Sequence, residues 1–154
     1  MNGELDPFEL KILRLLQADT DLSVADLADR VGLSTSPCWR RIDRLQREGY
    51  IRGRVALLDR AKLGLNVNIY LSVKLDANGR RHLDQFENAV MRHPEVIECH
   101  TVMGRFDYML RIVTQDIPAY EAFLMRVIGR LAGIAETSSM VTMSEVKSTT
   151  ALPI

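Results

Sequence analysis

The sequence contains little that would support catalysis or membrane insertion. No run of about 18 apolar residues is present, so no transmembrane helix is expected. The first residues, MNGELDPFEL, have neither the basic start nor the apolar core of a signal peptide. No nucleophile elbow, Walker loop or dinucleotide-binding fingerprint occurs anywhere in the chain. We therefore expect a cytoplasmic protein that is not an enzyme.

Potential metal ligands are also few. The chain has 2 cysteines and 3 histidines. Cys38 and Cys99 lie far apart and do not have metal-ligand spacing. Cys38 falls on an apolar helical stripe and Cys99 in a predicted strand, so we expect buried free thiols. His82, His93 and His100 share no local spacing. The sequence predicts no metal site and no cofactor.

The chain has no excess charge of either sign, but its charges are unevenly distributed. The formal net charge is zero, with 47% hydrophobic and 26% charged residues, as is typical of a globular protein. Its 154 residues allow one ordinary domain or two small ones. Residues 1–29 are mainly acidic, whereas residues 40–54 hold six arginines and only two acidic residues. A neutral total can therefore hide a basic face suited to a phosphate backbone.

The arginine-rich stretch 34–54 is the most informative part of the sequence. Cys38, Ile42 and Leu45 recur at helical spacing, which predicts a short helix with one buried stripe. Its Ser-Thr-Ser-Pro start and Gly49 suit the two ends of a helix. Hydroxyl, aromatic and arginine side chains on the other face suit the DNA major groove, although a solvated amphipathic helix has the same pattern. The candidate DNA-binding residues are Ser34, Thr35, Ser36, Trp39, Arg40, Arg41, Arg44, Arg47, Arg52 and Arg54.

Two further helices are predicted before this stretch. Residues 6–18 begin with a capping-box pattern, in which Asp6 is the N-cap and Glu9 lies three residues later. Residues 24–31 show a second helical period and lead through a glycine-containing turn into the arginine-rich helix, which is the helix-turn-helix layout. Residues 50–58 predict a small β-hairpin, or wing, beside the helices.

The second half of the chain follows a different pattern. The predicted elements are a strand at 67–75, a helix at 80–93, strands at 96–103 and 107–114, a helix at 117–131 and a strand at 138–147. This βαββαβ order is typical of a ferredoxin-like domain, in which one sheet face stays uncovered and favours self-association. We expect an α+β protein with a winged helix-turn-helix domain (1–58), a linker (59–65) and a ferredoxin-like domain (66–154).

Several different short motifs are spread along essentially the whole chain. They are Leu5-Asp6, Ile12-Leu13, Leu27-Ala28, Val31-Gly32-Leu33-Ser34, Arg41-Ile42 with Leu45, Glu48-Gly49, Gly104-Arg105-Phe106-Asp107-Tyr108 and Glu145-Val146-Lys147. In this order and spacing they resemble the leucine-responsive/AsnC (feast/famine) family of transcriptional regulators. Departures from the family pattern occur at Glu9, where Asp is usual, and at Asp43, where a basic residue is common. The resemblance implies that the second half is a RAM/ACT-like effector and oligomerisation domain.

The resemblance also implies that the turn at 104–108 helps to bind a free amino acid at an interface between dimers. Asp107 would pair with the ligand ammonium, and amides near Gly104 would bind its carboxylate. By their own pattern, Gly104 and Asp107 fit an ordinary hairpin turn, Tyr108 fits a core position, and residues 137–139 fit a strand start. The candidate effector-binding residues are Gly104, Arg105, Asp107, Tyr108, Thr137, Ser138 and Ser139.

The predicted function is a sequence-specific, DNA-binding transcriptional regulator whose assembly or DNA binding responds to a small effector. Its expected partners are double-stranded DNA, a free amino acid and further copies of itself, as dimers that assemble into octamers or similar rings. The segments 35–39 and 149–154 look like those of a family branch responding to cysteine, leucine or methionine. Trp39, bulkier than the usual aliphatic residue, fits either a groove contact or a wedge against the first helix. The alternative function is an architectural, nucleoid-type DNA-binding protein without effector control.

Overall fold

The structure is a computed structural model that describes residues 5–154. For Arg80 it describes the backbone alone. Its contacts form two compact units. One unit combines the residues up to Leu57 with Lys147–Ile154, and the other runs from Leu58 to Val146. The scheme expected from the sequence assigned 66–154 to a single domain, whereas the contacts group the C-terminal residues with the N-terminal unit.

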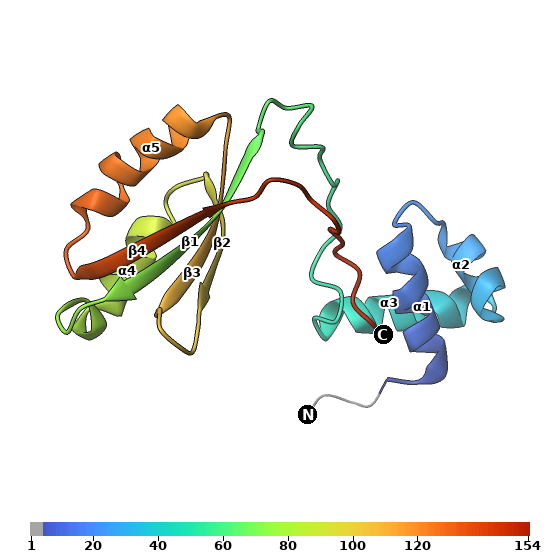
Figure 1. The fold of residues 1–154 in the computed structure, drawn as a ribbon. Coiled ribbons are helices and arrows are strands. Elements are labelled where there is room, and N and C mark those ends of the chain that lie inside the picture. Colours follow the sequence, from blue (N-terminus) through green and yellow to red (C-terminus); the bar gives the residue numbers. More distant parts are fainter. Residues whose placement is uncertain (1–4) are drawn as a thin grey trace. The chain divides into compact units, whose positions relative to one another are not determined.

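Three helices form the body of the N-terminal unit (Figure 1): α1 (Pro7–Ala18), α2 (Val24–Val31) and α3 (Thr35–Arg47). The capping box predicted for α1 is present, because the Glu9 amide donates to Asp6 Oδ1 (2.8 Å) and the Asp6 amide donates to Glu9 Oε2 (2.9 Å). These reciprocal bonds satisfy amides that the first helical turn leaves without partners. The start of α1 is therefore determined locally.

One apolar cluster holds the three helices together. Gly32 ends α2 in the left-handed region (φ 80°), a conformation that glycine adopts without a steric penalty, and the chain turns there into α3. Cys38 is fully buried in this cluster as a free thiol, as predicted, whereas Cys99 of the second unit is a free thiol that is only half-buried. The buried members are Ile12, Leu16, Leu27, Ala28, Val31, Cys38, Ile42 and Leu45.

The hairpin predicted at residues 50–58 is not formed. The described structure has no strand in this segment, although the Ile51 amide donates to the Leu45 carbonyl (3.1 Å) and ties its start to α3. Val55, Leu57 and Leu58 are all exposed. The prediction was wrong because alternating apolar residues need a second surface to cover them, and the described residues supply none here.

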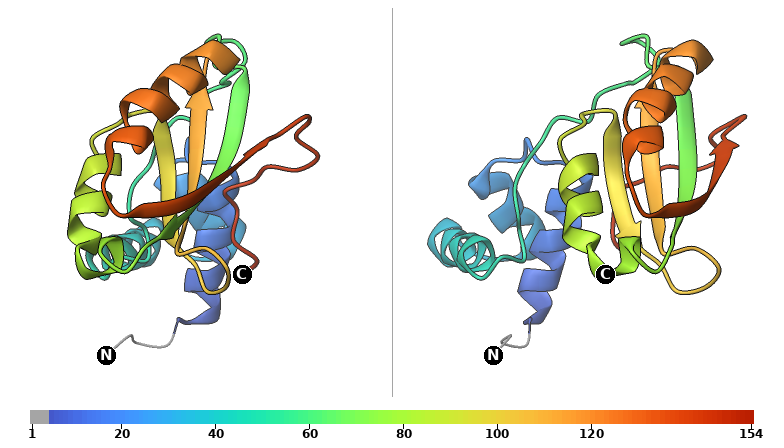
Figure 2. Two further views of the ribbon diagram at one scale, coloured as in Figure 1. Left: turned by 60° about the vertical axis from the view of Figure 1, so that its left-hand side comes forward. Right: turned by 90° about the vertical axis from the view of Figure 1, so that its left-hand side faces the viewer.

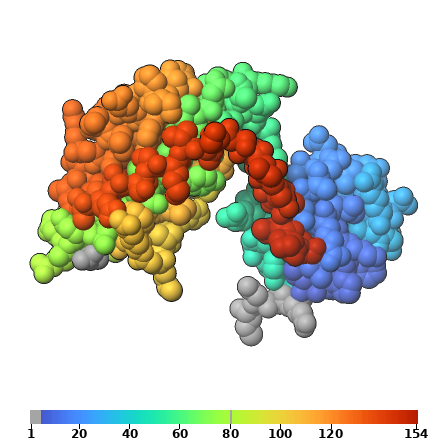
Figure 3. Space-filling view, in the orientation of Figure 1, coloured from blue at the N-terminus to red at the C-terminus, as the bar shows by residue number. Residues whose placement is uncertain are grey.

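The C-terminal residues lie against α1 within the N-terminal unit (Figure 3). Gln17 binds both groups of one peptide unit: its Nε2 donates to the Leu152 carbonyl (3.0 Å), and its Oε1 accepts from the Leu152 amide (2.9 Å). One turn earlier, Arg14 Nε donates to an oxygen of Ile154 (2.7 Å). Two polar side chains of α1 therefore hold the end of the chain.

The second unit has the predicted βαββαβ order. Its strands are β1 (Val67–Leu75), β2 (Val96–Thr101), β3 (Tyr108–Thr114) and β4 (Ile134–Val141), and its helices are α4 (Leu83–Val90) and α5 (Ile117–Arg126). The sheet is antiparallel with the order β2-β3-β1-β4, as in a ferredoxin-like fold. Both helices cover the same face of this sheet (Figure 2), as expected.

Several elements differ from their predicted bounds. β2 ends at Thr101 rather than 103, and α5 ends at Arg126 rather than 131. The last strand runs over Ile134–Val141 rather than 138–147 and starts directly after Gly133. A Cβ atom on Gly79 would overlap the Gly133 carbonyl, so the two backbones are in contact at this point. The pairing of β4 with β1 therefore begins at Ile134, directly after Gly133. The helix predicted at 80–93 is shorter, since a 3₁₀ turn (Gly79–Arg81) precedes α4.

The two faces of the sheet differ in character. The helix-covered face carries the apolar core, which includes Ile69, Leu71 and Val73 of β1. On the opposite face, Arg111 donates to Glu98 Oε1 (2.8 Å) and to Asn68 Oδ1 (3.1 Å). None of the helices in the described part of the unit covers this second face, which can therefore receive a partner.

Candidate nucleic-acid interface and effector site

Exposed hydroxyl groups surround the start of α3. Ser34 occupies the N-cap position with extended backbone (φ −77°, ψ 159°), but its hydroxyl makes no cap hydrogen bond. Thr35 and Ser36 follow it and are also exposed. The first amides of a helix lack helical partners and carry the positive end of its dipole. Free amides and hydroxyls at one helix end form a suitable phosphate-binding surface.

Trp39 lies on the surface. It is 56% exposed, which favours the groove contact over the wedge role considered from the sequence. Together with Val24 of α2 it lines an open hollow of about 530 Å³. The other lining residues are Thr35, Ser36 and Arg40. An aromatic ring, two hydroxyls and a guanidinium therefore share one exposed site.

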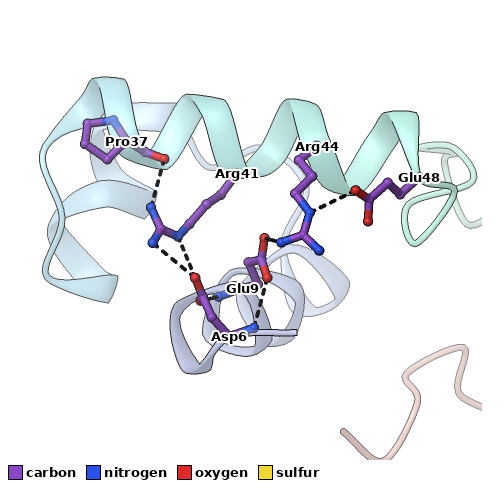
Figure 4. A network of polar contacts seen from close by, with 6 residues as sticks. All are labelled: Asp6, Glu9, Pro37, Arg41, Arg44 and Glu48. Atoms are coloured by element: carbon purple, nitrogen blue, oxygen red, sulfur yellow. Dashed lines mark hydrogen bonds and ion pairs between the residues drawn. The ribbon is translucent and has the colours of Figure 1, made fainter. Parts of the chain in front are cut away.

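Arg41, one of the predicted DNA contacts, is turned toward α1 (Figure 4). Its Nε and Nη2 both lie 3.1 Å from Asp6 Oδ2, and its guanidinium stacks 5.5 Å from the ring centroid of Phe8. Burial opposes ionisation of Asp6, but the Glu9 amide and the Arg41 guanidinium outweigh it and lower the pKa of the Asp6 carboxyl. Arg41 thus joins α3 to the capped start of α1.

Arg44 also pairs with α1, and its partner is buried. Glu9 is only 1% exposed, and its Oε1 accepts from Arg44 Nη1 at 2.8 Å. Arg44 Nε donates to Glu48 (3.0 Å), a bond that raises the pKa of Arg44 and lowers that of Glu48. Because a buried carboxylate is costly without a paired cation, Arg44 stabilises the contact between the two helices.

The other four candidate DNA-binding arginines, which are Arg40, Arg47, Arg52 and Arg54, are exposed. Arg47 is 72% exposed and bonds Asp43 one turn earlier (2.9 Å), a surface pair that contributes about 0.3–0.5 kcal/mol and exchanges readily. Arg40, Arg52 and Arg54 make no hydrogen bond or ion pair with any described residue. These four guanidinium groups can reach a nucleic acid without breaking a buried contact.

The predicted effector-binding turn is tied to the end of β1. Gly104 takes a positive φ of 136°. Asp107 Oδ2 accepts from the Leu75 amide (2.7 Å), while the Asp107 amide donates to the Val73 carbonyl (2.9 Å). Arg105 pairs with Glu136 at 2.6 Å, which joins the turn to β4. Among the described residues none donates to Asp107 Oδ1, so this oxygen can accept from a ligand ammonium.

The remaining predicted effector residues do not share one face of the sheet. Tyr108 is buried, as its alternation with apolar residues indicated, and donates to Glu87 (2.7 Å); burial, and then this bond, raises its pKa. Thr137 and Ser139 face the helix-covered side, where the Ser139 hydroxyl bonds Tyr120 (2.6 Å). Ser138 faces the opposite side because strand residues alternate.

Several partners in these contacts were not identified from the sequence. The pairing of Glu9 with Arg44 joins residues 35 positions apart, and no local pattern predicts such a contact. The same holds for Glu87, which accepts from Tyr108, and for Glu136, which pairs with Arg105. Only Glu9 had a local signal, as a capping residue, and that signal gave no indication of its burial.

Residues 5–154 contain neither a metal-ligand cluster nor a membrane-spanning helix. No group of three His, Cys, Asp or Glu side chains in this range is placed to hold a metal ion. No described helix is long and apolar enough to cross a membrane.

Two family models match the two parts of the chain. Residues 5–52 match a winged helix-turn-helix DNA-binding domain, and residues 68–152 match the Lrp/AsnC ligand binding domain. The first match confirms the type of N-terminal domain even though no wing strands pair among residues 5–154. The second covers more than half of the sequence, including the turn at Gly104–Tyr108.

Similar proteins span nearly the whole chain. The chain is 43% identical to a proline dehydrogenase transcriptional activator of Rhizobium radiobacter, and the match covers 95% of this chain and 94% of the relative. It is 36% identical to the DNA-binding transcriptional activator DecR of Escherichia coli, and that match covers 97% of this chain and 99% of the relative. An AsnC family regulator from Agrobacterium tumefaciens superposes with TM-score 0.91 at 45% identity, and a Neisseria meningitidis regulator in complex with L-Met with 0.92 at 31%, each covering 97% of both chains. With both domains and nearly the full length matched, the chain belongs to the Lrp/AsnC family of transcriptional regulators.

Proposed function

We propose that the protein regulates transcription by binding DNA through α3 and that a free amino acid bound by the second unit controls this binding. It acts by binding, without catalysis or a cofactor, and it acts in the cytoplasm. The observation that carries the proposal is the exposed face of α3, where hydroxyls, Trp39 and Arg40 surround one open hollow. Such a face has the donors and apolar groups that base edges and phosphates require.

The contacts of the arginines support different roles for them. Thr35, Ser36, Trp39 and Arg40 line the hollow and would contact base edges. Ser34, Arg47, Arg52 and Arg54 are exposed around it and would bind phosphates. Arg41 and Arg44 are occupied by Asp6 and Glu9, so they hold α3 in place and do not contact DNA.

Two exposed surfaces support self-association. The sheet face with Arg111 and Met140 is uncovered by helices, and the apolar side chains of Val55, Leu57 and Leu58 lie in water. Dimers related by a two-fold axis would present two α3 helices about 34 Å apart, which requires a pseudo-palindromic site. We propose that dimers assemble further into octamers or similar rings.

The effector would bind at the turn around Gly104. Asp107 Oδ1 would accept from the ligand ammonium, and amides at the turn would donate to its carboxylate. Arg105 and Glu136, already paired, would line the same end of the sheet. The L-Met complex of the similar Neisseria regulator supports an amino acid as the class of ligand. Methionine, leucine and cysteine are the first candidates.

A thermal-shift screen of the full chain against the twenty amino acids tests the effector. A ligand that binds the native state adds RT ln(1 + [L]/Kd), about 2.7 kcal/mol at a hundredfold excess. The expected result is a clear shift with one or two amino acids that disappears in Asp107→Asn, a variant that keeps an acceptor for the Leu75 amide. Glu121→Gln, an exposed carboxylate on α5, should keep the shift.

Selection of binding duplexes from a randomised pool tests DNA recognition. The regulator model predicts enrichment of a two-fold symmetric site whose affinity changes when the effector is added. Enrichment without sequence preference, together with no effect of any amino acid, would favour the architectural alternative. Loss of affinity in Arg40→Ala but not in Arg92→Ala, an exposed arginine of the second unit, would locate the interface on α3.

A further inference from the structure

The hollow on α3 has an apolar wall that includes Trp39, a residue outside the core of the N-terminal unit. Trp39 leaves more than half of its side chain in water, and Val24 of α2 lies beside it. The core of the N-terminal unit is complete without Trp39, which is not among the buried cluster. An exposed indole in a shallow hollow instead suits an apolar group of a ligand.

The polar groups beside Trp39 restrict what this ligand can be. Thr35 and Ser36 precede Trp39 by one helical turn, and Arg40 follows it directly, so all four project on one side of α3. Arg40 has no partner among the described residues, and a free arginine in the major groove pairs with guanine O6 and N7. The hollow therefore fits a DNA edge on which an apolar group lies close to hydrogen-bond acceptors.

Only one apolar group protrudes from base edges in the major groove, the C5-methyl group of a pyrimidine. We propose that Trp39, supported by Val24, is a specificity-determining residue that packs against this methyl group in each half of the binding site. Thymine carries the group in ordinary DNA, and 5-methylcytosine carries the same group at the same position. The inference rests on the proposed DNA-binding function and adds the chemical feature that is recognised.

Removing single methyl groups from the DNA tests the inference directly. A selected duplex would be resynthesised with deoxyuridine at one thymine at a time, and binding to the full chain would be followed by fluorescence anisotropy. Burial of one methyl group contributes a factor of about four in affinity. We expect one symmetric pair of thymines at which deoxyuridine weakens binding about fourfold per half-site, while the other thymines have little effect.

Variants of the protein identify which side chain is responsible. Trp39→Ala should bind the thymine and deoxyuridine duplexes equally, whereas Arg47→Ala should bind both more weakly and keep their ratio. At the sensitive position, 5-methylcytosine should bind more tightly than cytosine in the wild type only. Because Trp39 is exposed, Trp39→Ala should retain the unfolding midpoint of the wild type.

Two results would overturn the inference. Equal affinity for thymine and deoxyuridine at every position would exclude methyl recognition, and an undiminished preference in Trp39→Ala would assign it to another residue. Both leave DNA binding intact. Failure to enrich any duplex would instead refute the proposed function, and the methyl site with it.

Discussion

Replacement of Arg44 by methionine should destabilise the N-terminal unit and leave the second unit unchanged. Methionine keeps most of the aliphatic stem but removes the group that bonds Glu9 Oε1 at 2.8 Å. The Glu9 carboxylate accepts hydrogen bonds from Arg44 and from the Asp6 amide. In the variant it would stay buried and keep only the bond from the Asp6 amide. A buried charge that loses its counterion is the expected source of the effect.

The magnitude follows from the burial of the two partners. Removing one partner of a fully buried ion pair costs about 3–5 kcal/mol. Glu9 is 1% exposed but Arg44 is 33% exposed, so water can partly replace the guanidinium. We therefore expect a loss of about 2–3 kcal/mol, below the fully buried range. Arg47→Met provides the matched control, because its surface pair with Asp43 contributes less than about 0.5 kcal/mol.

Urea unfolding of the full chain measures this difference. Trp39 is the only tryptophan and lies on α3, so its fluorescence reports on the N-terminal unit alone. With a slope of about 1 kcal/mol per molar urea for a small unit, the midpoint of Arg44→Met should fall by about 2 M or more. The double variant Glu9→Gln/Arg44→Met should lose less than the sum of the two single losses.

A different result would contradict the role given to the pair of Glu9 and Arg44. Equal, small losses of stability in Arg44→Met and Arg47→Met would show that the buried pair does not hold the helices together. If Arg44→Met also lowered the salt dependence of DNA binding by about one unit, Arg44 would be a phosphate contact, as the sequence had suggested.

Three further predictions concern other parts of the chain. The pKa of Asp6 is lowered on folding, so its stabilising effect is present above the unfolded pKa of about 3.9 and is lost as the pH falls through the folded pKa. In urea unfolding, Asp6→Asn should therefore cost stability at about pH 6 and little at about pH 2. Burial raises the pKa of the Cys38 and Cys99 thiols, so a disulfide reagent should react slowly with both until urea unfolds the protein, and rapid labelling of the native chain would contradict this. Gln17→Ala should release the Leu152 peptide and speed carboxypeptidase digestion of the C-terminus, and an unchanged rate would show that the two hydrogen bonds do not hold it.

Several features that depend on neighbouring residues were predicted correctly from the sequence, although the hairpin at residues 50–58 was not. The first helix begins at Pro7 because Asp6 and Glu9 exchange hydrogen bonds across three residues, and such a motif is visible in the chain itself. The strand at Val67–Leu75 matches its predicted bounds because an apolar, β-branched run has few other structures available. The order of elements, and with it the fold, follows from signals of this kind.

The roles of the candidate site residues depended on distant contacts. Arg40 and Arg41 are adjacent and have the same chemistry, yet one is exposed beside the hollow and the other is held by Asp6, 35 positions away. Tyr108 follows Asp107 directly, but its ring enters the core while the Asp107 carboxylate binds the end of β1. The sequence alone therefore determined which chemical groups lie on each segment. Only the tertiary structure decided which of them remain free to bind, because burial and ion pairing depend on residues far apart in the chain.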